Sequence, residues 1–193
     1  FEYIASLFSE ERIQRSCAIV TDEDVQIVEK DSRFYKAEAE KRGKSRKGKL
    51  ATLYDENPWV ESFYAPHTLE VDFALTDERA NSDYISEIID LNYVDAATIK
   101  KHNDNLKKGT DAACAKTVLT LAGDMGKGWY ATTLSNYIDI AVSVPQYILE
   151  AVAFACREVI SVDIVFKMIE YSLNGYDEKE TLDLKKEIKK AKT

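Results

Sequence analysis

Cysteine is scarce in this chain of 193 residues, with three present at Cys17, Cys114 and Cys156. They lie far apart, no Cys-x-x-Cys pair is present, and neither histidine stands at a zinc-ligand spacing. The sequence therefore predicts neither a disulfide framework nor a zinc site. A reducing cytoplasm is the expected compartment.

Long apolar runs are also missing. No run approaches the roughly 20 residues of a membrane span, and the first residues lack the basic-then-apolar order of a signal peptide. Neither membrane insertion nor export is expected. With 45% apolar and 31% charged residues, the chain has the composition of one folded globular unit.

Positive charge is not in excess, because the formal net charge is -8. Proteins that hold nucleic acid mainly by phosphate contact tend to be basic, so the acidity argues against DNA binding of that kind. Nucleases that use Mg²⁺ or Mn²⁺ are an exception, since clustered carboxylates hold the cations and the cations face the phosphates.

An α/β half followed by a helical half is the predicted organisation. Residues 16–21 form an apolar run that ends in acids, which is typical of a buried parallel strand, and residues 59–64 favour a second strand. Residues 1–8 suggest an amphipathic helix. The basic segment 33–50 contains Gly43 and Gly48, which predict a short helix and then a mobile loop. Thr68 is the expected N-cap of the next helix. Further helices are expected at 81–92, 94–107, 110–123, 128–142, 145–158, 160–173 and 177–191.

Acidic residues form two candidate clusters. Asp22 and Asp24 follow the first strand, where two carboxylates one residue apart can converge on a cation. Taken alone, the motif is explained more simply as an acidic turn that caps the next helix. Glu70 and Asp72 follow Thr68 among apolar neighbours. The helix dipole favours acids in a first turn, so these two also have an explanation without a metal.

Basic residues supply two further candidates. Lys127 lies between two glycines before an apolar helix, where it could reach a phosphate, although a capping turn is the simpler reading and no Walker A motif is present. The basic segment could contact a DNA backbone or could be a solvated loop. Its candidate nucleic-acid-binding residues are Lys44, Arg46, Lys47 and Lys49.

The order of these motifs resembles one family. The run Thr-Asp-x-Asp after a strand, the later Thr-Leu-Glu-x-Asp, and Gly-Lys-Gly-Trp-Tyr-Ala followed by Val-Pro-Gln-Tyr-Ile at 144–148 are similar to the Toprim nuclease region of OLD (overcoming lysogenization defect) family ATP-dependent endonucleases. The resemblance covers about residues 1 to 158. It implies a partial Toprim-like parallel sheet core at residues 1–80, followed by a helical subdomain at 81–193 that completes the nuclease domain.

The resemblance also implies the chemistry. Asp22, Asp24, Glu70 and Asp72 would bind Mg²⁺ or Mn²⁺, as two ions, and Lys127 would stabilise the transition state of DNA cleavage. The implied partners are DNA, an upstream or partner ABC-type ATPase, a helicase-like protein and further copies of the chain, in defence against phage. The family's Glu-Gly-x-x-Glu-like motif is absent, so its strand and helix are expected to precede residue 1 and the metal site is expected to be incomplete.

Two alternatives follow from that departure. One is a non-catalytic module that keeps the Toprim fold in order to dimerise or to dock a partner within a defence complex. The other is topoisomerase- or primase-like chemistry, which is the weaker alternative because none of the 11 tyrosines stands in a recognisable nucleophile motif.

Overall fold

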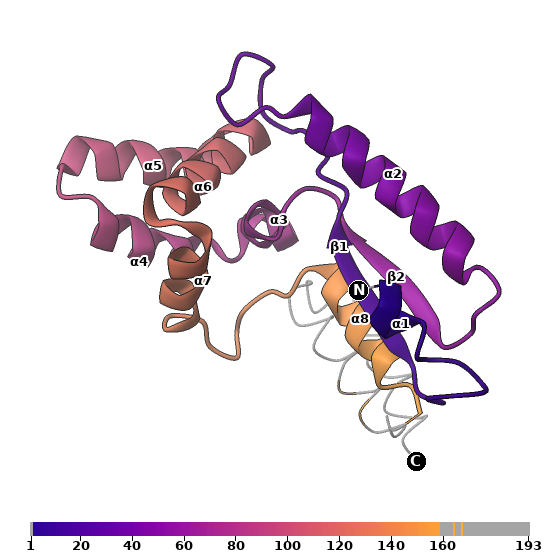
Figure 1. Ribbon diagram of the computed structural model, residues 1–193. Helices are drawn as coiled ribbons and strands as arrows, with labels where there is room; N and C mark the ends of the chain where they lie inside the picture. Colours follow the sequence, from indigo (N-terminus) through magenta and orange to yellow (C-terminus); the bar gives the residue numbers. More distant parts are fainter. Residues whose placement is uncertain (1, 159–163, 165–166, 168–193) are drawn as a thin grey trace, which may run out of the picture.

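Two parallel strands, β1 (Cys17–Asp22) and β2 (Val60–Ala65), form the sheet of the computed structural model, which describes residues 2–158, 164 and 167 (Figure 1). Cys17 pairs with Val60 and Asp22 with Ala65. Both predicted strands are confirmed, and the fold is mixed α/β as expected. Because the strands are parallel, their carboxyl ends share one edge of the sheet, and the loops that follow them begin side by side.

Helix α2 (Ala37–Tyr54) connects the strands and lies on one side of the sheet, while α8 (Gln146–Ala155) lies on the other (Figure 1). Leu50 of α2 packs with Ile19, Val60 and Ala5, the last of these from the short helix α1 (Glu2–Ala5). On the α8 side, the rings of Phe63 and Phe154 are 5.9 Å apart between centroids. The sheet is therefore covered on both faces, as apolar parallel strands require.

The prediction of a short helix and a mobile loop over 33–50 is wrong. Helix α2 runs without interruption through both Gly43 and Gly48. The reason is tertiary packing: Gly43 lies against the backbone of Glu23, and Leu50 is fully buried. Such contacts outweigh the weak helix propensity of glycine, which is worth about 1 kcal/mol relative to alanine. The predicted helix over 1–8 is also shorter in the structure, since α1 ends at Ala5.

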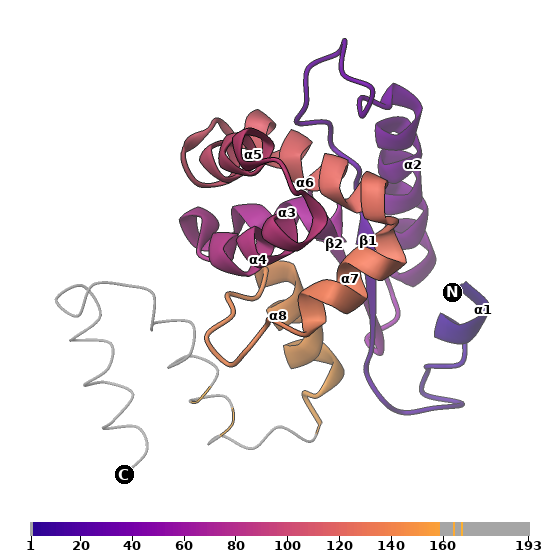
Figure 2. The ribbon, with the colours of Figure 1, turned by 90° about the vertical axis from the view of Figure 1, so that its left-hand side faces the viewer.

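The remaining helices gather beside one another, with α3 between them and the sheet (Figures 1 and 2). Their shared core is built on buried side chains of five helices, including Ile85, Leu106 and Val118. The elements are α3 (Leu69–Leu75), the 3-10 helix η1 (Thr76–Arg79), α4 (Ser82–Asn92), α5 (Ala96–Lys108), α6 (Asp111–Met125) and α7 (Lys127–Ser135).

Most helix predictions are confirmed to within a few residues, including the N-cap position of Thr68. The helix expected over 128–142 ends at Ser135 instead. The helices expected at 160–173 and 177–191 lie outside the described residues, apart from positions 164 and 167. Within the part of the chain that the structure describes, no helix has the length and apolarity needed to cross a membrane.

Asn81 joins the helical layer to the segment that leads into α8. Its side chain is fully buried. The amide nitrogen donates to the carbonyl oxygens of Phe73 and Ser143 at 2.9 and 2.7 Å, and the amide oxygen accepts the backbone N–H of Ser143 at 2.9 Å. Both N–H donors and the oxygen of this amide are thus used, and together they hold the chain just before α8 against α3.

Candidate functional site

The loops that leave the carboxyl ends of β1 and β2 run alongside each other. The backbone N–H of Glu23 donates to Ala65 at 2.8 Å, and that of Val25 donates to Pro66 at 2.9 Å. The ring Nδ1 of His67 lies 2.8 Å from the carbonyl oxygen of Val25. These contacts extend the pairing of the strands past the sheet and bring the two acidic motifs to the same edge.

The four predicted metal-binding acids gather at this edge. Asp22 ends β1, and Asp24 follows it in a left-handed conformation with φ of 56°. Glu70 and Asp72 lie in the first turn of α3, where one carboxylate oxygen of Asp72 accepts the backbone N–H of His67 at 3.2 Å. Burial, and then the negative charges of Asp24 and Glu70, raise the pKa of Asp22. The acids are therefore close enough to repel one another.

Lys127 reaches the same place from the start of α7. Its ammonium nitrogen lies 3.1 Å from a carboxylate oxygen of Glu70. The preceding Gly126 has φ of 82°, a left-handed conformation that glycine adopts without strain. Burial alone would raise the pKa of Glu70, but hydrogen bonding to its own backbone and the positive charge of Lys127 lower it overall. Lys127 and Glu70, predicted as separate site residues, are in direct contact.

Two basic side chains of α2, those of Arg46 and Lys47, contact the loop that follows β1. The guanidinium of Arg46 donates to the carbonyl oxygen of Asp22 and lies 3.4 Å from the carboxylate of Asp24. Lys47 pairs with Glu23, and its nitrogen lies 4.8 Å from the centre of the Tyr64 ring. Both residues therefore restrain the loop after β1. Their predicted role in DNA binding stays a prediction.

The other two basic candidates lie on the same helix. Lys44 pairs with Glu40 one turn away, at 2.7 Å, with 65% of its side chain exposed. Lys49 also has an interacting partner in the structure. An i, i+4 pair of this kind is weak, about 0.3–0.5 kcal/mol, so Lys44 could exchange Glu40 for a phosphate at little cost.

The donor chemistry of the edge suits Mg²⁺ or Mn²⁺, because both ions prefer oxygen ligands and the candidates are carboxylates. Among the residues that the structure describes, no group of three or more His, Cys, Asp or Glu side chains is arranged to hold a metal ion. Two of the acids are instead paired with basic side chains of the chain itself: Glu70 with Lys127, and Asp24 with Arg46. The carboxylate oxygens are thus the kind of ligand that such an ion prefers. To bind it, Glu70 would have to separate from Lys127, and Asp24 from Arg46.

Sequence reasoning missed several neighbours of the acids. Arg46 and Lys47 were expected to face solvent or DNA, and their contacts depend on the docking of α2, which no local pattern reveals. Tyr130 and Tyr147 were also missed as polar groups, although both belong to the motifs that carry the family resemblance. Their hydroxyl oxygens are buried and have no hydrogen-bond partner within the described part of the chain.

The buried carboxyl of Asp72 predicts a pH-dependent stability in the absence of metal. Burial, with the charges of Asp22 and Glu70, raises its pKa from 3.8 to about 6. Because this pKa is higher in the folded chain than in the unfolded chain, the folded state binds the proton more tightly. Stability should therefore fall as the pH rises from 3.8 to about 6, the interval between the two values.

Asp72→Asn should remove that dependence, because asparagine keeps an oxygen for the N–H of His67 but does not titrate. Urea unfolding in EDTA at several pH values measures the difference between the two proteins. The wild type should lose up to about 3 kcal/mol relative to the variant across the interval. Parallel stability curves for the two proteins would contradict the raised pKa.

The acids, Lys127 and Arg46 thus form one charged cluster at the carboxyl edge of the sheet, with oxygen donors suited to a hard cation and an exposed amine suited to a phosphate. Known families offer no further guidance on its role. Comparisons with protein-family models, with curated proteins and with solved structures find no match to this chain.

Proposed function

We propose that this chain is a divalent-metal-dependent DNA endonuclease, the Toprim-like nuclease part of an ATP-dependent OLD-family protein that acts in anti-phage defence. The observation that supports this most is the meeting of Asp22, Glu70 and Lys127 at one edge of the sheet. Residues from β1, α3 and α7, separated widely in the sequence, form one charged cluster. Carboxylates beside a lysine suit metal-assisted attack on a phosphodiester.

The acids would hold the cations. Asp22 and Asp24 lie on the loop after β1, and Glu70 and Asp72 lie at the start of α3. When bound, two Mg²⁺ or Mn²⁺ ions would supply positive charge to the attacking and leaving oxygens of the phosphodiester. Arg46 holds the backbone of Asp22 and the carboxylate of Asp24, so it limits how far this loop can move.

Lys127 would contact the phosphate. Its side chain is 64% exposed, whereas that of Glu70 is 14% exposed. The pair is therefore asymmetric: the amine is accessible to a substrate, and the carboxylate stays within the protein. A lysine in this place can stabilise negative charge that develops on the phosphate or on the leaving oxygen. Glu70 orients the amine until the substrate arrives.

The basic side of α2 would extend the DNA contact, with Lys44, Lys47 and Lys49 beside the phosphate backbone and Arg46 nearer the acids. Each phosphate contact releases counterions, so binding should weaken as salt rises. The proposed partners are an ABC-type ATPase, a helicase-like protein and a second copy of this chain.

Cleavage of supercoiled plasmid tests this function. The full chain is incubated with Mn²⁺, with Mg²⁺ or with EDTA, beside an Asp22→Ala variant. Nicked or linear product is expected with Mn²⁺ or Mg²⁺, no product with EDTA, and at least about 100-fold less product with the variant, because a metal ligand is lost. Equal cleavage by Asp22→Ala, or cleavage in EDTA, would contradict the proposal.

A non-catalytic docking or dimerisation module is the alternative function, and a specific observation favours it. Lys127 and Arg46 already neutralise Glu70 and Asp24, so these acids are satisfied without a metal. This alternative predicts a stable oligomer that has no measurable affinity for Mn²⁺. Because a second copy of the chain is a partner under both functions, calorimetric titration with Mn²⁺ is the measurement that separates them.

A further inference from the structure

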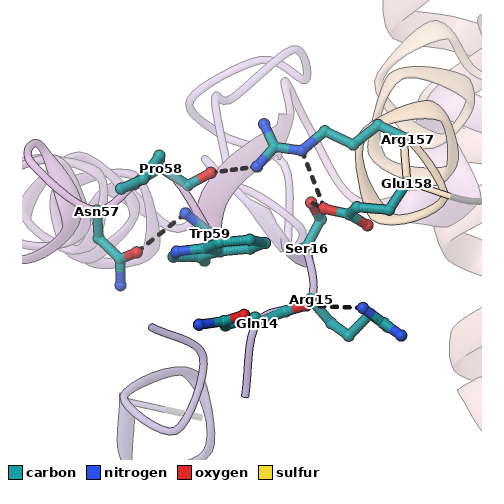
Figure 3. Close-up of polar contacts among 8 residues, drawn as sticks. All are labelled: Gln14, Arg15, Ser16, Asn57, Pro58, Trp59, Arg157 and Glu158. Atoms are coloured by element: carbon teal, nitrogen blue, oxygen red, sulfur yellow. Dashed lines mark hydrogen bonds and ion pairs between the residues drawn. The ribbon is translucent and has the colours of Figure 1, made fainter. Parts of the chain in front are cut away.

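Helix α8 is anchored at the amino ends of both strands (Figure 3). Arg157, just past the end of α8, donates to the carbonyl oxygen of Pro58, two residues before β2. Glu158 accepts the hydroxyl of Ser16, the residue before β1, and also pairs with Arg157 at 3.2 Å. The carboxyl end of α8 is thus located at the edge of the sheet opposite the acids.

The beginning of α8 must then lie toward the acidic edge. A helix of 10 residues is about 15 Å long, and a strand of six residues about 20 Å, so α8 spans most of the sheet. Figure 1 shows this antiparallel course. The contact between the rings of Phe63 and Phe154 shows that this helix packs on β2, and Tyr147 lies two turns before Phe154 on the same side of α8. Tyr147, the second residue of α8, is therefore placed near Asp22 and Asp72.

The hydroxyl of Tyr147 is buried, yet it has no hydrogen-bond partner among the residues that the structure describes. The residue is 9% exposed, and its oxygen is shielded from solvent. Burial, and then the negative charges of Asp72, Asp22 and Glu70, raise its pKa, which places the phenol beside the acidic cluster. Buried hydroxyls almost always have a partner, so an unpaired donor facing carboxylates points to a bond made in another state of the site.

We propose that Tyr147 is a positioning residue of the acidic site, and that its hydroxyl donates a hydrogen bond to the carboxylate of Asp72 when the acids bind a divalent cation. This inference rests on the proposed metal-dependent function. One oxygen of Asp72 already accepts the N–H of His67, which leaves further acceptor capacity on the carboxylate. Carboxylates that ligate metals are themselves held by hydrogen bonds from a second layer of residues.

Tyr147→Phe tests the assignment, because phenylalanine keeps the ring and removes only the hydroxyl. Tyr84→Phe is the matched control, since the hydroxyl of Tyr84 donates to Asp139, a residue of the loop after α7 that is not among the four acids. Two quantities are measured on the full chain: thermal unfolding in EDTA, and the Mn²⁺ dissociation constant by isothermal titration calorimetry.

In EDTA, Tyr147→Phe should unfold at the wild-type temperature or above it, because the hydroxyl makes no bond there. Its Mn²⁺ dissociation constant should rise by about tenfold or more. Tyr84→Phe should show the reverse: a lower unfolding temperature in EDTA, because a formed hydrogen bond is lost, with unchanged Mn²⁺ affinity. This opposite pattern is one that a merely structural role for Tyr147 would not produce.

Three results would overturn the inference. Wild-type Mn²⁺ affinity in Tyr147→Phe would show that the hydroxyl does not support the acids. A lower stability of Tyr147→Phe in EDTA would show that the hydroxyl already has a structural acceptor. Absence of Mn²⁺ binding by the wild type would remove the proposed metal site itself, and this outcome is distinct from the first because it does not depend on the variant.

Discussion

Lys127→Ala is expected to reduce Mn²⁺-dependent plasmid cleavage by about 100-fold or more while leaving Mn²⁺ binding intact or slightly tighter. The first effect follows because the exposed amine is the group placed to stabilise charge on the phosphate. The second follows because Lys127 pairs with Glu70 at 3.1 Å, and its removal frees that carboxylate for a cation. Cleavage rates and calorimetric Mn²⁺ titration separate the two effects.

Lys108→Ala is the control for this prediction. Lys108 is the exposed last residue of α5 and has no contact with the four acids in the described structure, so its removal changes the net charge equally and should leave cleavage unchanged. Equal cleavage by Lys127→Ala and the wild type would contradict the role of Lys127. Loss of Mn²⁺ binding in Lys127→Ala would mean that the lysine supports the acids instead of competing for them.

Gly43→Ala and Gly48→Ala are expected to change the stability in opposite directions although both glycines lie inside α2. A Cβ atom at Gly43 would lie 2.0 Å from the carbonyl oxygen of Glu23, whereas a Cβ at Gly48 would meet nothing within 4 Å. Gly43→Ala should lower the free energy of unfolding by about 3 kcal/mol, since backbone must move. Gly48→Ala should raise it by about 1 kcal/mol, the helix-propensity gain.

Urea unfolding of the two variants and the wild type measures these changes. Gly43 allows α2 to pack closely against the backbone of Glu23, which lies between Asp22 and Asp24. Gly43→Ala should therefore also weaken Mn²⁺-dependent cleavage, and Gly48→Ala should not. A stabilising effect of Gly43→Ala would show that α2 does not lie against Glu23, and the contacts of Arg46 and Lys47 with the loop would then be in question as well.

The strands and the acidic edge could be predicted because their signals are local. The apolar run at 16–21 and the second run at 59–64 each identify a strand from a few residues. Parallel strands place their carboxyl ends together, so acids that follow both strands are expected at one edge. The approximate positions of α4, α5 and α6 follow likewise from apolar spacing, and in the structure Asp95 and Thr110 cap α5 and α6.

The contacts that surround the acids could not be predicted, because they depend on the docking of distant segments. Arg46 meets Asp22 and Asp24 only when α2 folds as one helix, and Gly43 looks like a helix breaker until Glu23 lies against it. Tyr147 lies 75 residues after Asp72, and nothing in the apolar sequence around this tyrosine indicates that its hydroxyl lies near carboxylates. Contacts between segments that are distant in the sequence cannot be predicted from the spacing of residues within one segment.

Calorimetric titration of the full chain with Mn²⁺, beside Asp22→Asn, tests the central claim most directly, because every proposed step requires these acids to hold a divalent cation. The account predicts saturable binding by the wild type, with an affinity at least about tenfold weaker in Asp22→Asn. No saturable binding by the wild type, or equal affinity in the two proteins, would contradict a metal site at this edge of the sheet and would favour the docking module.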